Sequence, residues 1–278
     1  MEAPRRPSIS VVVPTRDRPD ALDACLAALD RQTVAGSLEV VVVDDSSDAA
    51  KEVADVVGRH EPARLARVRS AGPAAARNAG AREARGETLC FTDDDCVPED
   101  DWVEQLIFAI RDGADAAAVK TLNPEGALGA ASEVISAAPT AAEPFAPSNN
   151  LACTKAVFET VPFDESYREA AAEDRDWCAR LVASGHTLRP QPSAVVHHRA
   201  ELTLASFLRR QVRYGRGAYR YRRTTHRRLE PGRFYLALLR RGFERGFGAG
   251  LLVSLAQLAT AAGWVGGWLE LQRAQRRQ

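Results

Sequence analysis

Short runs of β-branched residues alternate with helix-like stretches through the first 120 residues, and this order limits the possible folds more than any other feature. Residues 9–13 (ISVVV) and 39–43 (EVVVV) are apolar runs of the kind found in strands buried on both faces. We therefore expect an α/β fold with a doubly wound, mixed but mostly parallel sheet and helices on both faces. The other expected elements here are strands at 65–68 and 88–92 and helices at 19–32, 49–59, 72–85 and 101–111.

The second half of the chain carries weaker signals of the same kind. The stretch 123–146 is rich in alanine, glycine and proline, which favours a flexible loop or lid. A helix over 173–184 is expected to end at Gly185, because glycine commonly follows the last turn. The remaining expected elements are strands at 148–153 and 193–198, a helix from 155 and a basic helical segment at 204–228.

Composition excludes several classes of protein. The chain has 278 residues, of which 45% are hydrophobic and 27% charged, so it is neither disordered nor a low-complexity fibre. Its five cysteines are scattered and odd in number, which argues against a disulfide framework or structural zinc and favours a reducing compartment. Residues 1–8 are polar and rich in proline, so we expect no secretory signal and a cytoplasmic location.

The formal net charge of zero hides a strong asymmetry. Residues 201–278 contain 16 arginines and four glutamates, a balance of +12, so residues 1–200 carry −12. We expect an acidic domain over 1–203 and a basic, helical C-terminal region over 204–278. Such a basic region can face nucleic acid, anionic lipid or a phosphorylated substrate, and charge alone does not choose among them.

An uncharged segment over 246–269 follows the arginine-rich stretch. Its 24 positions are long enough to cross a bilayer, although six glycines weaken that signal. A helix in the membrane interface, or one buried against the protein or a second subunit, is the alternative. Arginines flank both ends, which gives no orientation bias and favours a helix lying along the inner face of the plasma membrane.

Acidic residues follow three of the expected strands. In open α/β sheets ligands bind beyond the carboxyl ends of the strands, where this chain has Asp17, the pair Asp44–Asp45 and the triplet Asp93–Asp95. Three adjacent carboxylates repel one another unless a cation lies among them, and oxygen ligands suit Mg²⁺ or Mn²⁺ bridging a diphosphate. The alternative is a solvated acidic turn that precedes a helix.

Five segments in order resemble the inverting glycosyltransferases of family 2, which have the GT-A fold. They are VVVPTRDRP, EVVVVDDSSD, GPAAARNAGAREARGETLCFTDDDCVPEDDW, AAEDRDWCARL and VVHHR, and the resemblance covers roughly residues 8–225. It implies transfer of a hexose from a nucleoside-diphosphate sugar, uridine-linked in our interpretation, to an acceptor hydroxyl. The acceptor is unknown, with a lipid-linked molecule or a polysaccharide as candidates.

The resemblance also assigns residues to the donor. Asp45, or alternatively Asp44, is expected near the uracil or the ribose, although either could instead cap a helix. Arg77 is expected to contact the base or the phosphates. The full set of expected nucleotide-sugar contacts is Pro14, Thr15, Asp17, Asp44, Asp45, Arg77, Asp93, Asp94 and Asn150.

The triplet matches the family's DXD motif, which holds a divalent metal. Asp93 and Asp95 occupy its outer positions, and because the middle residue is also aspartate the binding pair stays open. His197, with His198 as the alternative, resembles the late histidine that some members add as a ligand. Carboxylate and imidazole together suit Mn²⁺, and Mg²⁺ is the other candidate.

The segment Glu173–Trp177 resembles the motif near the acceptor. An inverting transfer needs one carboxylate to take the proton of the attacking hydroxyl, and we assign that role to Asp174. Glu173 and Asp176 are candidates for acceptor contacts, or simply for acids that complement a helix dipole. Trp177 could stack on a sugar, but core packing is the better interpretation.

Other functions are less well supported by the sequence. No Gly-rich phosphate loop follows residue 13, which disfavours a nucleotidyltransferase of the lysine-loop kind and a dinucleotide oxidoreductase. A membrane- or nucleic-acid-binding protein that uses its arginine-rich segment without catalysis is the main alternative. We expect no nucleic-acid partner, because that segment resembles the tail that many family members carry.

Overall fold

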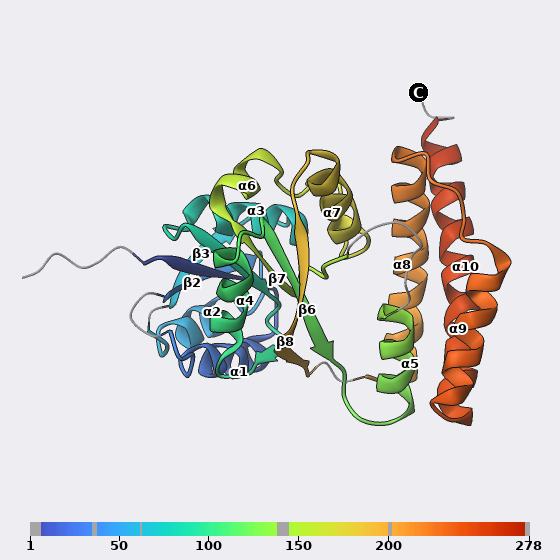
Figure 1. The fold of residues 1–278 in the computed structure, drawn as a ribbon, viewed down its shortest axis with the longest axis horizontal. Helices are drawn as coiled ribbons and strands as arrows, with labels where there is room; N and C mark the ends of the chain where they lie inside the picture. Colours follow the sequence, from blue (N-terminus) through green and yellow to red (C-terminus); the bar gives the residue numbers. More distant parts are fainter. Residues whose placement is uncertain (1–6, 35–37, 62, 138–144, 200–201, 276–278) are drawn as a thin grey trace, which may run out of the picture. The chain divides into compact units, whose positions relative to one another are not determined.

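The computed structural model describes residues 7–34, 38–61, 63–137, 145–199 and 202–275. The chain divides into two compact units, and each is described by itself. The first comprises residues 1–122, 144–168 and 174–199, and the second residues 123–143, 169–173 and 200–278. Most elements of both are labelled in Figure 1.

The first unit is built on an eight-stranded sheet in the order β3-β2-β1-β4-β7-β6-β8-β5. Strands β1 to β4 run parallel, whereas β7 is antiparallel to its neighbours β4 and β6. The strands are β1 Ile9–Thr15, β2 Leu38–Asp45, β3 Ala63–Val68, β4 Thr88–Thr92, β5 Cys96–Pro98, β6 Ala116–Leu122, β7 Asn150–Thr154 and β8 Leu188–His198. The predicted doubly wound, mostly parallel sheet is confirmed.

Helices cover both faces of this sheet because alternate residues of each strand point to opposite sides. Val11 and Val13 of β1 pack with α1, α2 and α4, whereas Val12 packs with α3, α6 and α7. These helices are α1 Pro19–Leu29, α2 Ala50–Val57, α3 Pro73–Glu83, α4 Trp102–Arg111, α6 Lys155–Thr160 and α7 Glu173–Ala183. Both faces are apolar, which explains the uninterrupted runs in β1 and β2.

The second unit is helical and has its own apolar core. It contains α5 Ala127–Ser136, α8 Leu204–Thr224, α9 Gly232–Glu244 and α10 Phe247–Gln275, which lie side by side in Figure 1. Phe207, Leu238 and Val253 meet in its core with two residues of α5. α10 is long and apolar enough over Phe247–Arg273 to cross a membrane, which by itself is weak evidence for a span.

Most expected elements are present, but α5, β5, β6 and α9 were not expected as separate elements. The prediction of a loop over 123–146 is wrong for α5, whose Ala131 and Val134 repeat at helical spacing and are buried. β5, β6 and α9 were not predicted, since β5 has only three residues and β6 is rich in alanine. All five cysteines are buried and free, in agreement with the predicted absence of a disulfide framework.

Candidate active site

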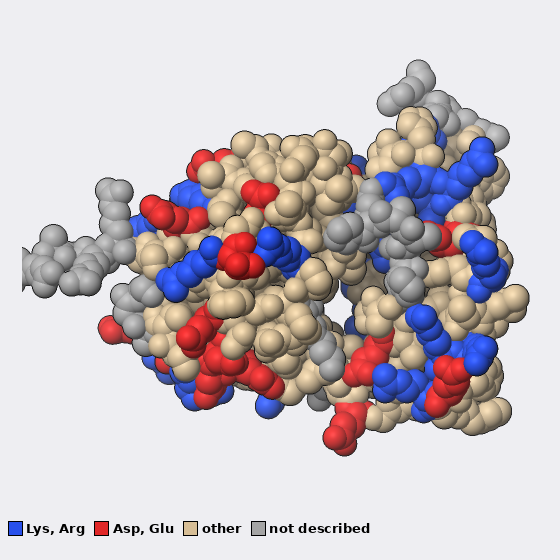
Figure 2. Space-filling view, in the orientation of Figure 1, with Lys and Arg blue, Asp and Glu red and all other residues tan. Residues whose placement is uncertain are grey.

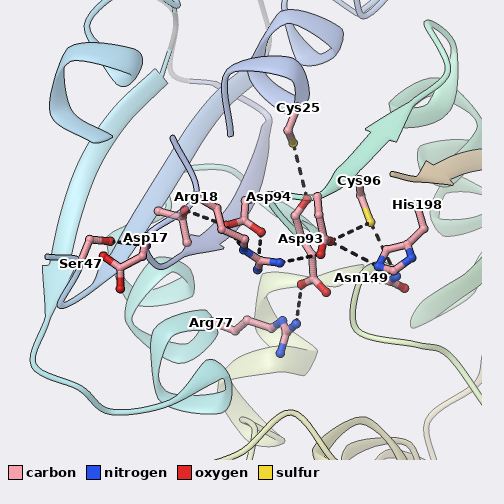
Figure 3. Close-up of polar contacts among 12 residues, drawn as sticks. Asp17, Arg18, Cys25, Ser47, Arg77, Asp93, Asp94, Cys96, Asn149 and His198 are labelled. Carbon is pink, nitrogen blue, oxygen red and sulfur yellow. Dashed lines mark hydrogen bonds and ion pairs between the residues drawn. The ribbon is translucent and has the colours of Figure 1, made fainter. Parts of the chain in front are cut away.

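The three aspartates that follow β4 each have a different environment (Figure 3). Asp94 has no exposed surface and accepts a hydrogen bond of 2.7 Å from the hydroxyl of Thr15. Arg18 contacts both carboxylate oxygens of Asp94, with its Nε 3.1 Å from Oδ2 and its Nη2 2.5 Å from Oδ1. Its Nη1 lies 2.6 Å from Oδ2 of Asp95. A single guanidinium next to the start of α1 therefore contacts two of the three carboxyl groups.

Burial and the neighbouring cations act differently on these carboxyls. Burial raises the pKa of Asp94 to about 7, although Arg18 opposes the rise. Burial also works to raise the pKa of Asp95, but the contacts with His198 and Arg18 outweigh it and lower the pKa to about 2. Asp95 is thus the carboxylate of the pair that stays charged at neutral pH.

β8 brings a histidine to this cluster. His198 Nε2 lies 3.5 Å from Asp95 Oδ1, whereas His197 Nε2 lies 3.2 Å from Glu99 Oε1. Successive residues of a strand point to opposite faces, so only one of the two histidines can face the aspartates. Of the two candidates, the alternative His198 and not the preferred His197 lies beside the triplet, and its role as a metal ligand stays a prediction.

The donor set fits a hard or borderline divalent cation. Asp95 and His198 already face each other, and a carboxylate with an imidazole suits Mn²⁺. Within the described ranges no three acidic, histidine or cysteine side chains converge as a metal cluster. Mg²⁺ and similar ions are often held by one or two protein ligands plus phosphate oxygens and water, so two ligands are sufficient here.

Arg77 connects the aspartates with Asp174. It lies on α3, is 2% exposed, and its Nη2 is 2.6 Å from Asp93 Oδ1. Burial raises the pKa of Asp174, while the nearby charges of Arg175 and Arg77 oppose the rise. Asp93, Arg77 and Asp174 therefore belong to one electrostatic group, as expected if the triplet and the proposed base serve one reaction.

The turn before α3 is fixed by Asp45. Its two carboxylate oxygens accept backbone hydrogen bonds from Ala71 at 2.6 Å and Gly72 at 3.0 Å. Gly72 has φ of +86°, and a Cβ there would come within 2.4 Å of the carbonyl oxygen of Arg168, so glycine is required. Asp45 thus orients the helix that carries Arg77, and its contact with a base stays a prediction.

Hydrogen bonds connect the loops that follow β1 and β2. Asp17 has a positive φ of 55° and accepts hydrogen bonds from the backbone of Asp48 and Ala49, just before α2. Asp44 accepts a bond of 2.8 Å from the backbone of Ser47 within the loop, and α2 begins after Ala49 without a side-chain cap, so Asp44 does not cap that helix. Pro14 and Thr15 end β1 at the same edge of the sheet.

Two predicted contact residues lie in the interior instead. Asn150 has no exposed surface, and its Oδ1 accepts a 2.7 Å bond from Trp102 Nε1. Trp177 is also fully buried, donates to the carbonyl of Val161 at 2.6 Å and packs on Phe163. Neither side chain is available to a ligand, so the assignments of Asn150 to the donor and Trp177 to the acceptor are corrected.

The two other acceptor candidates begin α7 with Asp174. Glu173 is 3% exposed, and Asp176 is 7% exposed and paired with Arg180 at 2.7 Å. The i,i+4 pair stabilises the helix, which is the structural role considered for Asp176. The sequence interpretation missed the role of Arg18. An arginine in the loop after the first strand, at the same sheet edge as three aspartates, could have predicted this ion pair.

A comparison with protein families decides the assignment. The family model described as glycosyl transferase family 2 matches residues 10–173. The chain belongs to glycosyl transferase family 2. The match runs from β1 to the first residue of α7, so it includes every strand-end carboxylate described above and stops one residue before Asp174.

Several similar proteins are named glycosyltransferases. The pre-mycofactocin glycosyltransferase of Mycobacterium tuberculosis is 30% identical over 237 residues, which is 77% of this chain and 49% of that protein. Glycosyltransferase AglE of Haloferax volcanii is 34% identical over 108 residues, which is 37% of this chain and 36% of that protein. The chain thus spans about half the length of the first of these relatives.

Solved structures share the GT-A-like fold. The mannosyltransferase PcManGT from Pyrobaculum calidifontis, in complex with GDP-Man and Mn²⁺, aligns with a TM-score of 0.64 at 19% identity. The alignment covers 99% of this chain and 83% of that one. Residues 1–349 of S. aureus TarS, in complex with UDP-GlcNAc, align at 0.54 and 19% identity, over 86% and 73% of the two chains.

Proposed function

We propose that the protein is a metal-dependent inverting glycosyltransferase that moves a hexose from a nucleoside-diphosphate sugar to an acceptor hydroxyl. The observation that carries the proposal is the group formed by Asp93, Arg77 and Asp174, in which one buried arginine links the DXD triplet to a carboxyl of raised pKa. Residues 1–203 are the proposed catalytic domain, and 204–278 the proposed acceptor or membrane contact region.

Asp95 and His198 are the proposed metal ligands, with Asp93 completing the family's outer pair. Bound there, Mn²⁺ or Mg²⁺ would offset the negative charge that builds on the departing diphosphate. Arg77 is placed to add a permanent positive charge on the same side. Arg18 pairs with the buried Asp94, so a metal would be held through the outer carboxylates Asp93 and Asp95 and not through Asp94.

Asp174 is the proposed general base. As the acceptor oxygen attacks the anomeric carbon, its proton passes to the Asp174 carboxylate while the bond from that carbon to the diphosphate oxygen breaks. The displacement occurs in one step, so the configuration inverts and no covalent enzyme intermediate forms. Burial favours this role, because a carboxyl of raised pKa is a stronger base than an exposed aspartate.

The donor is proposed to be uridine-linked, and the acceptor a lipid-linked molecule or a polysaccharide at the cytoplasmic face of the membrane. Similar folds with GDP-Man and with UDP-GlcNAc support a nucleotide sugar and leave the base to be tested. Thermal-shift measurements with uridine- and guanosine-diphosphate hexoses would distinguish the two, because a ligand selective for the folded state raises its melting temperature.

The test of the base is Asp174→Asn, which keeps the shape of the side chain and removes its proton affinity. Transfer should fall by about a hundredfold or more, while donor affinity measured by calorimetry stays within about threefold. Asp176→Asn, on the same helix turn, is the matched control and should keep most of its turnover. Unchanged turnover in Asp174→Asn would refute the assignment.

A further inference from the structure

The outward face of α10 is apolar along its whole length. Its large exposed side chains recur at intervals of three, four and seven residues, apart from the adjacent last pair, and are Phe247, Leu251, Leu258, Val265, Trp268 and Leu269. The opposite face, with Ala249, Val253 and Ala256, is buried in the helical unit. A surface helix of a soluble protein normally presents polar residues to the solvent, so an apolar outward face indicates an interaction site.

α9 continues the same surface. Leu236 is 67% exposed and Phe243 47% exposed, again seven residues apart, and the ring of Phe243 lies 6.1 Å from that of Phe247. We call these eight residues of α9 and α10 the apolar strip. Its exposed side chains form a row that runs from one helix to the next, and Arg240, paired with Glu244 at 2.8 Å, adjoins it on α9.

Arginines border the apolar strip. Arg233 and Arg240 lie one turn before and after Leu236 on the same face of α9, and Arg273 lies one turn after Leu269 on α10. The second unit as a whole has 16 arginines and nine glutamates, a balance of +7. Arginines cover much of this unit's surface in Figure 2. Such side chains can reach lipid phosphates while their stems contact acyl chains.

α8 excludes the interpretation that α10 crosses the bilayer. A Cβ on Gly215 of α8 would lie 2.0 Å from the carbonyl oxygen of Thr260, and one on Gly263 would lie 1.9 Å from that of Val212. The two helices are therefore in backbone contact. Seven arginines of α8 run along this pair, namely Arg209, Arg210, Arg213, Arg216, Arg220, Arg222 and Arg223. A spanning α10 would draw several of them into hydrocarbon, which is costly.

We propose that the apolar strip docks on an anionic phospholipid surface, with α9 and α10 lying in the plane of the interface. The occupant is a bilayer and not a second copy of the chain, because the unit's balance of +7 would make two copies repel each other, whereas it attracts anionic lipid. The proposal deepens the membrane association proposed above and rests on it, but it does not depend on sugar transfer.

The experiment is vesicle flotation of the full chain without donor or acceptor. One vesicle type is phosphatidylcholine alone, and the other an equal mixture of phosphatidylcholine and phosphatidylglycerol. The protein should float with the mixed vesicles and much less with the neutral ones. Raising the salt from about 0.1 M to about 1 M shortens the Debye length from about 10 Å to about 3 Å and should weaken binding.

Two sets of variants separate the strip from other surfaces. Leu258→Glu with Val265→Glu should lower vesicle partitioning by about tenfold or more, and Arg233→Gln with Arg240→Gln should lower it by a smaller factor. All these positions are exposed, so the helical circular-dichroism signal should not change. Phe108→Glu is the matched control, because Phe108 is 66% exposed on α4 and lies outside the strip.

Three results would overturn the proposal. The first is a chain that stays out of both vesicle types, and the second is binding that the glutamate pair does not reduce. The third is resistance to extraction by alkaline carbonate, which indicates a spanning helix. If the glutamate pair instead converts a dimer to a monomer in sedimentation while vesicles bind nothing, the strip is a subunit interface. Because no sugar is present, failure here leaves the proposed transfer reaction standing.

Discussion

Asp94 should make the protein less stable as the pH rises from about 5 to about 8. Its pKa is 3.8 in a solvated chain and about 7 in the folded one, because burial opposes ionisation. Between these values the folded state binds the proton and the unfolded state does not, so the free energy of unfolding falls with increasing pH. The stabilisation by the bound proton is full below the unfolded-state pKa of 3.8 and is lost as the pH rises through the folded-state pKa of about 7.

The size of this effect follows from the shift. A change of about three pKa units corresponds to about 4 kcal/mol at about 1.4 kcal/mol per unit, of which a little over half falls between about pH 5 and pH 8. We therefore expect the wild type to lose about 2 kcal/mol over this range relative to Asp94→Asn, whose amide does not titrate.

Urea denaturation in the presence of a chelator measures this difference at each pH. Subtracting the curve of Asp94→Asn from that of the wild type removes contributions from other titrating groups. Asp48→Asn, at an exposed position near the site, makes the same charge change where little solvation is lost on folding and is the control. A difference between wild type and Asp94→Asn that stays constant over the range would refute a buried, proton-binding Asp94.

Two further predictions concern the fold around the site. Gly80→Ala should lower the free energy of unfolding by about 1–2 kcal/mol, because a Cβ would lie 2.3 Å from Cγ1 of Val12 and overpacking exceeds the gain in helix propensity. Chemical denaturation checks this, and adding Val12→Ala should recover part of the loss. For His60, burial lowers the pKa, but hydrogen bonds to Asp30 and Asp23 outweigh it and raise the pKa above 6.5. Its stabilising effect should be full below about pH 6.5 and fade as the pH rises through the folded value, as measured against His60→Gln; an unchanged difference would contradict this.

The convergence of the site on one edge of the sheet was predictable from sequence. Parallel strands present their carboxyl ends at the same edge, so acids after β1, β2 and β4 had to meet there. The family resemblance added the order of the motifs and the role of Asp174. The strand pattern and the family resemblance can both be read from sequence without knowing how side chains pack.

What could not be predicted depended on side-chain direction. The choice between His197 and His198 turns on which face of β8 each occupies, and pairing with the short strand β5 fixes that register. α5 was missed because its alanines and glycine give a weak apolar pattern, and its burial depends on contacts with helices distant in sequence.

Donor binding with and without metal tests the central claim most directly. With a uridine-diphosphate hexose and Mn²⁺ at about a hundred times the dissociation constant, the folded state should gain about 2.7 kcal/mol, which raises the melting temperature by several degrees. Asp95→Asn should lose most of this rise, since Asp95 and His198 are the proposed ligands. A wild-type rise that neither chelator nor Asp95→Asn diminishes would contradict a donor held through a metal at the aspartate triplet.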